Sequence, residues 1–92
     1  MPKICEALTI VNRLGLHARP ATQLAKISGE FNSTITLQIG DKTADASSVL
    51  GLMLLAGSQG KVVMVTVDGD DAEAAFEAVK TLFCTKFLEE DN

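Results

Sequence analysis

Residues 31–46 have the sequence FNSTITLQIGDKTADA, and this stretch decides the kind of fold that the chain can form. Between residues 31 and 39 apolar and polar side chains alternate, so that they lie on opposite faces. One face has Phe31, Ile35, Leu37 and Ile39, and the other has Asn32, Thr34, Thr36 and Gln38. A period of two is typical of a strand with one face buried and one in water. Gly40-Asp41 then favours a two-residue hairpin turn into a weaker strand over residues 42–46.

The segments on either side of this hairpin predict two more strands and three helices. Residues 7–11 and the β-branched residues 61–67 are predicted strands. Helical spacing of apolar residues begins at about Ala18, with Pro20 in the first turn, where a missing N–H is tolerated, and Gly29 as the stop. Ser47 and Ser48 are suitable caps for a short helix over residues 49–55.

The end of the chain predicts a long amphipathic helix after the turn at residues 68–70. Asp70 and Glu73 have the spacing of a capping box. The apolar stripe of this helix contains Ala75, Phe76, Val79, Leu82, Phe83 and Phe87. Residues 89–91 are expected to form a frayed acidic tail.

The predicted element order is therefore β-α-β-β-α-β-α, in one domain over residues 1–92. Strands and helices mixed in this way, with one hairpin and a half-polar strand, favour an α+β fold. We expect an open-faced β-sandwich in which the helices cover one face of the sheet.

Composition excludes several classes of function. The chain has 92 residues, a net charge of -4, one histidine, two cysteines and no Trp or Tyr. Nucleic-acid binding requires a basic surface, and a metal site requires more nitrogen and sulfur ligands than this chain has. Cys5 and Cys84 form no CxxC pair and are expected to be small buried side chains. We expect a cytoplasmic protein, since no signal peptide and no apolar run long enough to cross a membrane is present.

The residues that indicate chemistry are Gly15-Leu16-His17-Ala18-Arg19-Pro20-Ala21, which place the only histidine before a helix. The backbone amides of Ala18 and Arg19 have no acceptor within that helix and lie at the positive end of its dipole, where phosphate binds readily. The Arg19 guanidinium can reach phosphoryl oxygens. On physical grounds alone, a phosphate-accepting His17 and a surface or helix-capping His17 remain about equally supported.

The segment Leu14-Gly15-Leu16-His17-Ala18-Arg19-Pro20-Ala21 resembles the active-site signature of the HPr family, the histidine-containing phosphocarriers of the phosphoenolpyruvate-dependent phosphotransferase system. Ser47-Ser48-Val49-Leu50-Gly51-Leu52-Met53 resembles the regulatory-serine helix of that family. The resemblance covers essentially the whole chain.

This resemblance implies a four-stranded antiparallel sheet in the order 1-4-2-3, with three helices on one face. It implies that His17 is phosphorylated on Nδ1 by an enzyme I and passes the group to an enzyme IIA, with Arg19 as the phosphate-stabilising arginine. No cofactor is implied, and Mg²⁺ is needed only by the enzyme I donor. Ser48 matches the regulatory serine, although a purely capping serine is about as well supported by residue type.

The second predicted helix also indicates where partners dock. Val49, Leu52, Met53 and Ala56 are expected to face the core, which leaves Leu50 and Leu54 no inward direction. We expect Leu50, Met53 and Leu54 to contribute to a docking patch beside His17.

The branch of the family is indicated by Gly51, because sugar-pathway carriers of enteric type tend to have a basic residue there. The apolar helix and the C-terminal sequence resemble the nitrogen-related branch (NPr), which we favour over the sugar branch. A monomer is expected.

Two other classes of function remain open at this point. One is a regulatory binding module whose phosphorylation state controls other proteins. The other is a βαββαβ sensor of small molecules such as amino acids, which needs a ligand crevice between protomers.

Overall fold

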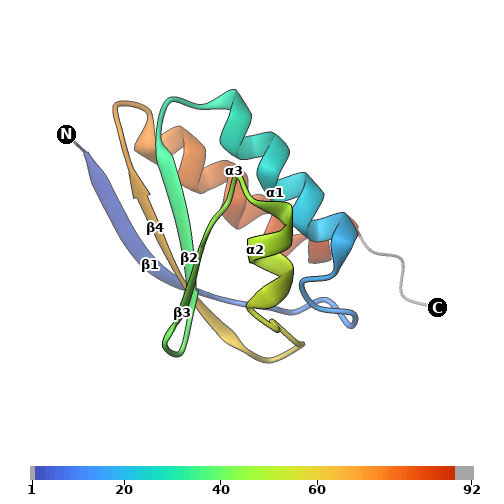
Figure 1. Cartoon of the computed structure of the whole chain (residues 1–92). Helices are drawn as coiled ribbons and strands as arrows, with labels where there is room; N and C mark the ends of the chain where they lie inside the picture. Colours follow the sequence, from blue (N-terminus) through green and yellow to red (C-terminus); the bar gives the residue numbers. More distant parts are fainter. Residues whose placement is uncertain (1, 89–92) are drawn as a thin grey trace.

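The computed structural model describes residues 2–88 and contains the predicted order of strands and helices. One antiparallel sheet, in the order β1-β4-β2-β3, is formed by β1 (Lys3–Thr9), β2 (Thr34–Ile39), β3 (Lys42–Asp45) and β4 (Val62–Asp68). The helices α1 (Ala18–Glu30), α2 (Val49–Leu54) and α3 (Ala72–Cys84) cover one face, and a short turn, η1 (Lys86–Leu88), follows α3 (Figure 1). The predicted open-faced sandwich is confirmed.

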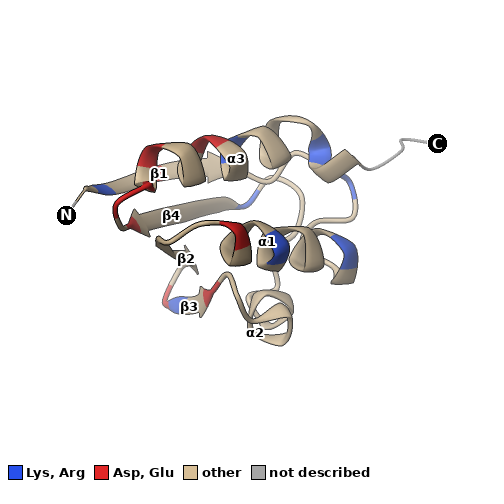
Figure 2. Cartoon of the chain, turned by 90° about the horizontal axis from the view of Figure 1, so that it is seen from above, with Lys and Arg blue, Asp and Glu red and all other residues tan. Residues whose placement is uncertain are grey.

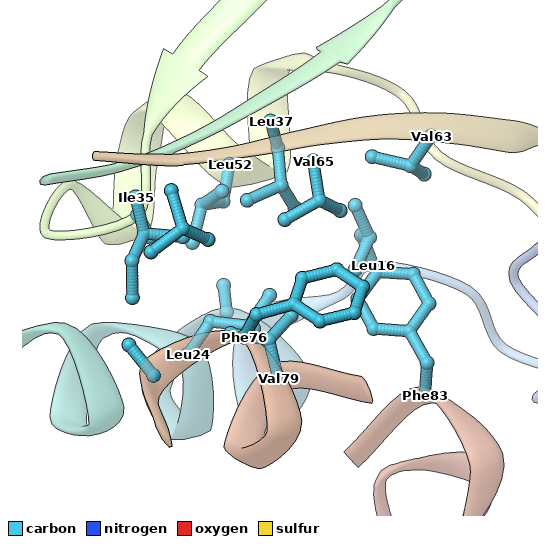
Figure 3. Close-up of a cluster of buried hydrophobic side chains, with 14 of the residues drawn as sticks. Leu16, Leu24, Ile35, Leu37, Leu52, Val63, Val65, Phe76, Val79 and Phe83 are labelled. Carbon is cyan, nitrogen blue, oxygen red and sulfur yellow. The ribbon is translucent and has the colours of Figure 1, made fainter. Parts of the chain in front are cut away.

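The core lies between the helices and the inward rows of β2 and β4. Every second residue of β4 is fully buried, and Ile35 and Leu37 of β2 continue the same layer. Leu24, Phe76, Val79 and Phe83 meet them from α1 and α3 (Figure 3). The core is therefore mainly aliphatic, because the sheet contributes only branched aliphatic side chains to it.

β1 differs from the predicted strand over residues 7–11, since it begins and ends earlier. It pairs only with β4, from Lys3 opposite Asp68 to Thr9 opposite Val62, and this pairing sets its length. Glu6, opposite the buried Val65, points to the helix side yet stays exposed at the sheet edge. An inward-pointing charge on an edge strand discourages pairing with another chain.

β2 also begins later than predicted, because residues 31–33 bend toward α3 instead of joining the sheet. The carboxylate of Asp71 accepts hydrogen bonds from the amide of Asn32 at 2.8 Å and from the hydroxyl of Ser33 at 2.6 Å. Both bonds lower the pKa of Asp71 below its ordinary value, and the bond from Ser33 has the larger effect. The predicted Asp70 cap is wrong: Asp71 is the N-cap residue of α3, and its side chain does not cap the helix.

α2 has the predicted start but a different inward face. Leu52 and Leu55 are buried, whereas Met53 and Ala56 are exposed, so the expectation that the latter two face the core is wrong. The helix ends at Leu54, and the chain turns sharply at Ala56, where φ is 56°. Leu55 still has right-handed helical backbone angles (φ -66°, ψ -17°), so it lies on the same inward side as Leu52, three residues earlier.

The expectation that the cysteines are buried is also wrong, since both Cys5 and Cys84 are exposed free thiols. Cys5 lies in the outward row of β1, where its sulfur is 3.5 Å from the hydroxyl oxygen of Thr66. Cys84 is the last residue of α3, and the neighbouring Phe83 takes the inward position. Position on the element, not the apolar character of the thiol, decides the exposure.

Phe87 is buried as predicted, but it does not continue α3. Lys86, Phe87 and Leu88 all have φ between 53° and 59°, a left-handed turn that folds the chain back. The ring centroids of Phe83 and Phe87 are 4.9 Å apart. The predicted acidic tail at residues 89–91 lies outside the described residues, and the single domain over residues 1–92 stays a prediction.

Candidate functional site

His17 lies where the chain enters α1, at the rim of the sandwich. It is the N-cap residue, with an extended backbone (φ -90°, ψ -168°), and its carbonyl oxygen accepts the first helical hydrogen bond from Ala21 at 3.1 Å. Its side chain is partly exposed. The structure therefore presents the imidazole at the surface rather than inside the core.

The loop before His17 is fixed by hydrogen bonds at both ends. The side-chain amide of the fully buried Asn12 donates to the carbonyl oxygen of Gly15 at 2.8 Å. The backbone amide of Leu16 donates to the carbonyl oxygen of Gly57 at 2.7 Å, and the Leu16 side chain is buried in the core. These contacts hold the backbone on which His17 is mounted.

Gly15 and Gly57 permit this close approach. Gly15 has φ of +67°, and a Cβ there would collide with the carbonyl oxygen of Gly57. A Cβ on Gly57 would lie 2.8 Å from side-chain carbons of both Ile10 and Leu16. The loop therefore meets the backbone of Gly57 so closely that Gly15 must be glycine, whereas a side chain at Gly57 would crowd the ends of the Ile10 and Leu16 side chains.

The start of α1 has two backbone amides available to an anion. Within residues 2–88, the amides of Ala18 and Arg19 donate no hydrogen bond, and Pro20 has no amide hydrogen. The first turn contains no acidic residue. With the exposed Arg19 side chain, this end of the helix combines amide donors, the positive end of a dipole and a guanidinium.

An exposed apolar surface accompanies this site. Leu50 is 67%, Leu54 66% and Met53 42% exposed, and we call these three residues the α2 patch. Figure 2 shows α2 without a charged residue, whereas the neighbouring α1 and β3 both carry charges. Because the Leu16–Gly57 hydrogen bond joins the His17 loop to the segment just after α2, the C-terminal end of this helix lies next to the His17 loop.

Ser48 lies at the opposite end of α2 from this junction. Its hydroxyl oxygen accepts a hydrogen bond from the amide of Gly51 at 3.0 Å, so it is a true helix cap, as expected for a serine in this position. Ser47 instead bonds the Asp45 carboxylate through its amide and hydroxyl. The structure thus separates the roles of the two serines, which sequence alone could not do.

Sequence reasoning missed two residues of this site, Asn12 and Gly57, which hold the loop. Leu14, which the sequence offered only as part of the family signature, is 59% exposed and places a further apolar side chain three residues before His17. The turn pattern from Asn12 to Gly15 was the only available signal, because asparagine opens and glycine closes such turns. Nothing in the sequence indicated the contact with Gly57.

Chemically, this arrangement suits a surface imidazole that exchanges an anionic group with a second protein. Among residues 2–88, no group of three or more His, Cys, Asp and Glu side chains is placed to hold a metal ion. The same part of the chain contains no helix that is long and apolar enough to cross a membrane.

Comparison with known proteins agrees with this class. Residues 4–85 match the family described as "PTS HPr component phosphorylation site". The chain is 46% identical over 89 residues to the phosphocarrier protein NPr of Shewanella violacea, covering 97% of this chain and 98% of that protein. It is 42% identical over 83 residues to the phosphocarrier protein HPr of Xylella fastidiosa, covering 90% and 93%.

A solved structure shows the same fold along the whole chain. The crystal structure of HPr from Thermoanaerobacter tengcongensis superposes with a TM-score of 0.87 at 38% identity, covering 99% of this chain and all of that one. The chain belongs to the HPr family. Its role is that of a phosphocarrier of a phosphotransferase system, in which proteins of this family work with enzyme I and enzyme IIA.

Proposed function

We propose that His17 of this chain accepts a phosphoryl group on Nδ1 from an enzyme I and passes it to an enzyme IIA of the nitrogen-related phosphotransferase system. The group originates in phosphoenolpyruvate. The carrier acts as a cytoplasmic monomer with no cofactor of its own, and Mg²⁺ is required only by the donor enzyme.

One observation supports this proposal most directly: His17 is the partly exposed N-cap residue of α1, beside two amides without hydrogen-bond partners in the described chain. On loading, Nδ1 of His17 attacks phosphorus in line while the bond from phosphorus to the donor atom breaks. On delivery, a nucleophile of the enzyme IIA attacks phosphorus and the bond to Nδ1 breaks. The amides of Ala18 and Arg19 and the guanidinium of Arg19 stabilise the charge on the phosphoryl oxygens. Positioning and electrostatics suffice, because the transfer potential comes from the donor.

The nitrogen-related branch is supported by α2. Gly51 leaves that helix without charge, and the relative that is 46% identical over nearly the full chain is named NPr. Relatives named HPr reach 42% identity, so the branch rests on the character of α2 as much as on overall similarity. A regulatory phosphate on Ser48 stays a prediction; it would add negative charge beside the α2 patch.

The test is phosphorylation with phosphoenolpyruvate, Mg²⁺ and an enzyme I, followed by phosphorus NMR of the intact chain. We expect one acid-labile, alkali-stable signal that is absent from His17→Ala. A signal of unchanged intensity in His17→Ala would refute the assignment. Far-ultraviolet circular dichroism of the variant serves as the control for folding.

Arg19 is tested separately with Arg19→Lys and Arg19→Ala. Both variants should still accept a phosphoryl group, but more slowly, by about tenfold for the alanine variant and less for lysine, which keeps the charge and loses the planar fork. Lys26→Ala, at an exposed position further along α1, is the matched control. Equal rates for Arg19→Ala and Lys26→Ala would exclude a role for the guanidinium.

The branch is tested by competition between acceptors. Phosphorylated chain is mixed with equal amounts of a nitrogen-branch and a sugar-branch enzyme IIA, and the initial rates of transfer are compared. Faster transfer to the nitrogen-branch acceptor supports the proposal, whereas faster transfer to the sugar-branch acceptor assigns the chain to the other branch.

A further inference from the structure

The peptide group between Gly15 and Leu16 is held at both of its polar ends. Its carbonyl oxygen, on Gly15, accepts hydrogen bonds from the side-chain amide of Asn12 at 2.8 Å and from the backbone amide of His17 at 3.0 Å. Its amide, on Leu16, donates to the carbonyl oxygen of Gly57 at 2.7 Å. Because a peptide group is planar, these three bonds, which we call the loop anchor, fix the orientation of a plane only one residue before His17.

Asn12 contributes the only side chain to the loop anchor, and that side chain is completely buried. Among residues 2–88, the buried polar side chains are those of Asn12 and Ser33, and Ser33 keeps 6% exposure. Burying a side-chain amide costs free energy unless it is hydrogen-bonded, and an apolar side chain would fill the same place without that cost. Packing alone therefore does not account for an asparagine at this position.

The loop anchor also determines which amides can meet a phosphoryl group. Because the His17 amide donates to Gly15, it is already occupied. The first amides without an acceptor in residues 2–88 are those of Ala18 and Arg19. These donors stabilise phosphoryl oxygens only where Nδ1 of His17 places the oxygens within hydrogen-bond reach. The position of Nδ1 relative to the start of α1 is therefore the quantity that the backbone before His17 must hold constant.

We propose that Asn12 is a positioning residue for phosphoryl transfer. Through its bond to Gly15 it holds the backbone of His17, so that a phosphoryl group on Nδ1 meets the two free amides of α1. The proposal rests on the proposed function, in which the bond from Nδ1 to phosphorus forms as the bond from phosphorus to the donor atom breaks. A misplacement of about 1 Å can slow such a step by about a hundredfold.

The buried position of Asn12 separates this role from docking. A side chain with no exposed surface touches no partner protein. Its loss should therefore slow the transfer step and leave the affinity for the partner unchanged. A residue that merely supports the docking surface would change the affinity as well.

The first test compares two truncations of fully buried side chains. Asn12→Ala removes one bond of the loop anchor, and Val67→Ala opens space in the core. Val67 lies at the far end of β4 from the loop, because the start of β4 adjoins Lys61, whose carbonyl oxygen accepts from the Ile10 amide. Asn12→Ala should accept a phosphoryl group from saturating phosphorylated enzyme I about tenfold more slowly, with a Kd within about twofold of wild type. Val67→Ala should match wild type in both.

Two results of this comparison would overturn the proposal. One is an equal transfer rate in Asn12→Ala and Val67→Ala, with urea unfolding showing that both are folded. The other is a rise in Kd as large as the loss of rate, because it would place the effect in docking. Failure of the proposed function is recognised separately, since the wild-type chain would then take up no phosphoryl group from enzyme I.

Proton NMR of the wild-type chain gives a measurement that does not depend on the folding of a variant. On phosphorylation the amide proton signals of Ala18 and Arg19 should move downfield, while those of the Asn12 side-chain amide stay in place. The Asn12 protons should exchange with water at least about tenfold more slowly than those of Gln38, an exposed side-chain amide that donates to the carbonyl oxygen of Gly40. Exchange at equal rates, or a movement of the Asn12 signals as large as that of Ala18, would contradict a fixed anchor.

Discussion

The amide of Leu16 donates a 2.7 Å hydrogen bond to the carbonyl oxygen of Gly57, which joins the loop that carries His17 to the segment that follows α2. The two residues are far apart in the sequence, and neither has a polar side chain. This bond fixes the position of the histidine relative to the α2 patch. Four predictions test this arrangement and other contacts that hold the fold.

Gly15→Ala is expected to destabilise the fold by about 2 kcal/mol, since the new methyl group meets the Gly57 carbonyl at a positive φ. Gly40→Ala is the matched control: its φ is +61°, but a Cβ there meets nothing within 4 Å. The control should cost about 1 kcal/mol, from backbone conformation alone. Urea unfolding measures both, and equal losses would show that the Gly57 contact is unimportant.

Ala56→Gly is expected to stabilise the protein by about 1 kcal/mol, because Ala56, directly after the C-cap residue of α2, has a left-handed φ of 56° that favours glycine. The same substitution in the middle of a helix should have the opposite sign. Ala78→Gly, at a half-buried position in the middle of α3, is therefore the control and should cost about 1 kcal/mol. Thermal and urea unfolding of the two variants should move in opposite directions, and a loss of stability in Ala56→Gly would contradict the prediction.

Ser48→Ala should cost about 1 kcal/mol, because the amide of Gly51 loses its acceptor at the start of α2. Ser47→Ala should cost roughly half as much, since the Asp45 carboxylate keeps its bond to the Ser47 amide. Urea midpoints compare the two, and a larger effect at Ser47 would show that the capping assignment is wrong.

Asp71→Asn tests the link between α3 and the segment before β2. Because the hydrogen bonds from Ser33 and Asn32 lower the folded-state pKa of Asp71, the ionised carboxylate stabilises the fold above the ordinary pKa of aspartate. That contribution is lost as the pH falls through the lowered value. Wild type should therefore unfold at higher urea than Asp71→Asn near pH 7, with the difference shrinking below about pH 4.

The control for this pH dependence is Asp70→Asn, which removes the same charge one residue earlier. Its urea midpoint should differ little from wild type at any pH between about 2 and 7. A difference between wild type and Asp71→Asn that stays constant over this range would show that the carboxylate is not the source of the effect.

Sequence patterns predicted the four strands and the three α-helices in the correct order. They could do so because the spacing of apolar residues shows which side of each element faces the core. Residues 31–33 were misassigned because their alternation continues the strand pattern, while their hydrogen bonds go to Asp71. Phe87 was correctly predicted as buried, although a left-handed turn rather than a helix puts it there. Local patterns could not show either contact.

The candidate site was predictable only in part. His17, Arg19 and the start of α1 follow from the local sequence, and Leu50 and Leu54 were expected to be exposed because a short helix cannot bury every side. The bond from Leu16 to Gly57 depends on backbone segments brought together by the whole fold. Such a contact leaves no periodic signal.

The position of His17 at the rim has a consequence for the lifetime of any group that it carries. A ring that is partly exposed at the edge of a sandwich is open to solvent, so a phosphoryl group held there would face hydrolysis between encounters with partner proteins. The yield of delivery would then depend on the ratio of two times, that of diffusion to an acceptor and that of spontaneous loss. At low acceptor concentration, a larger fraction of the phosphoryl groups would be hydrolysed before delivery.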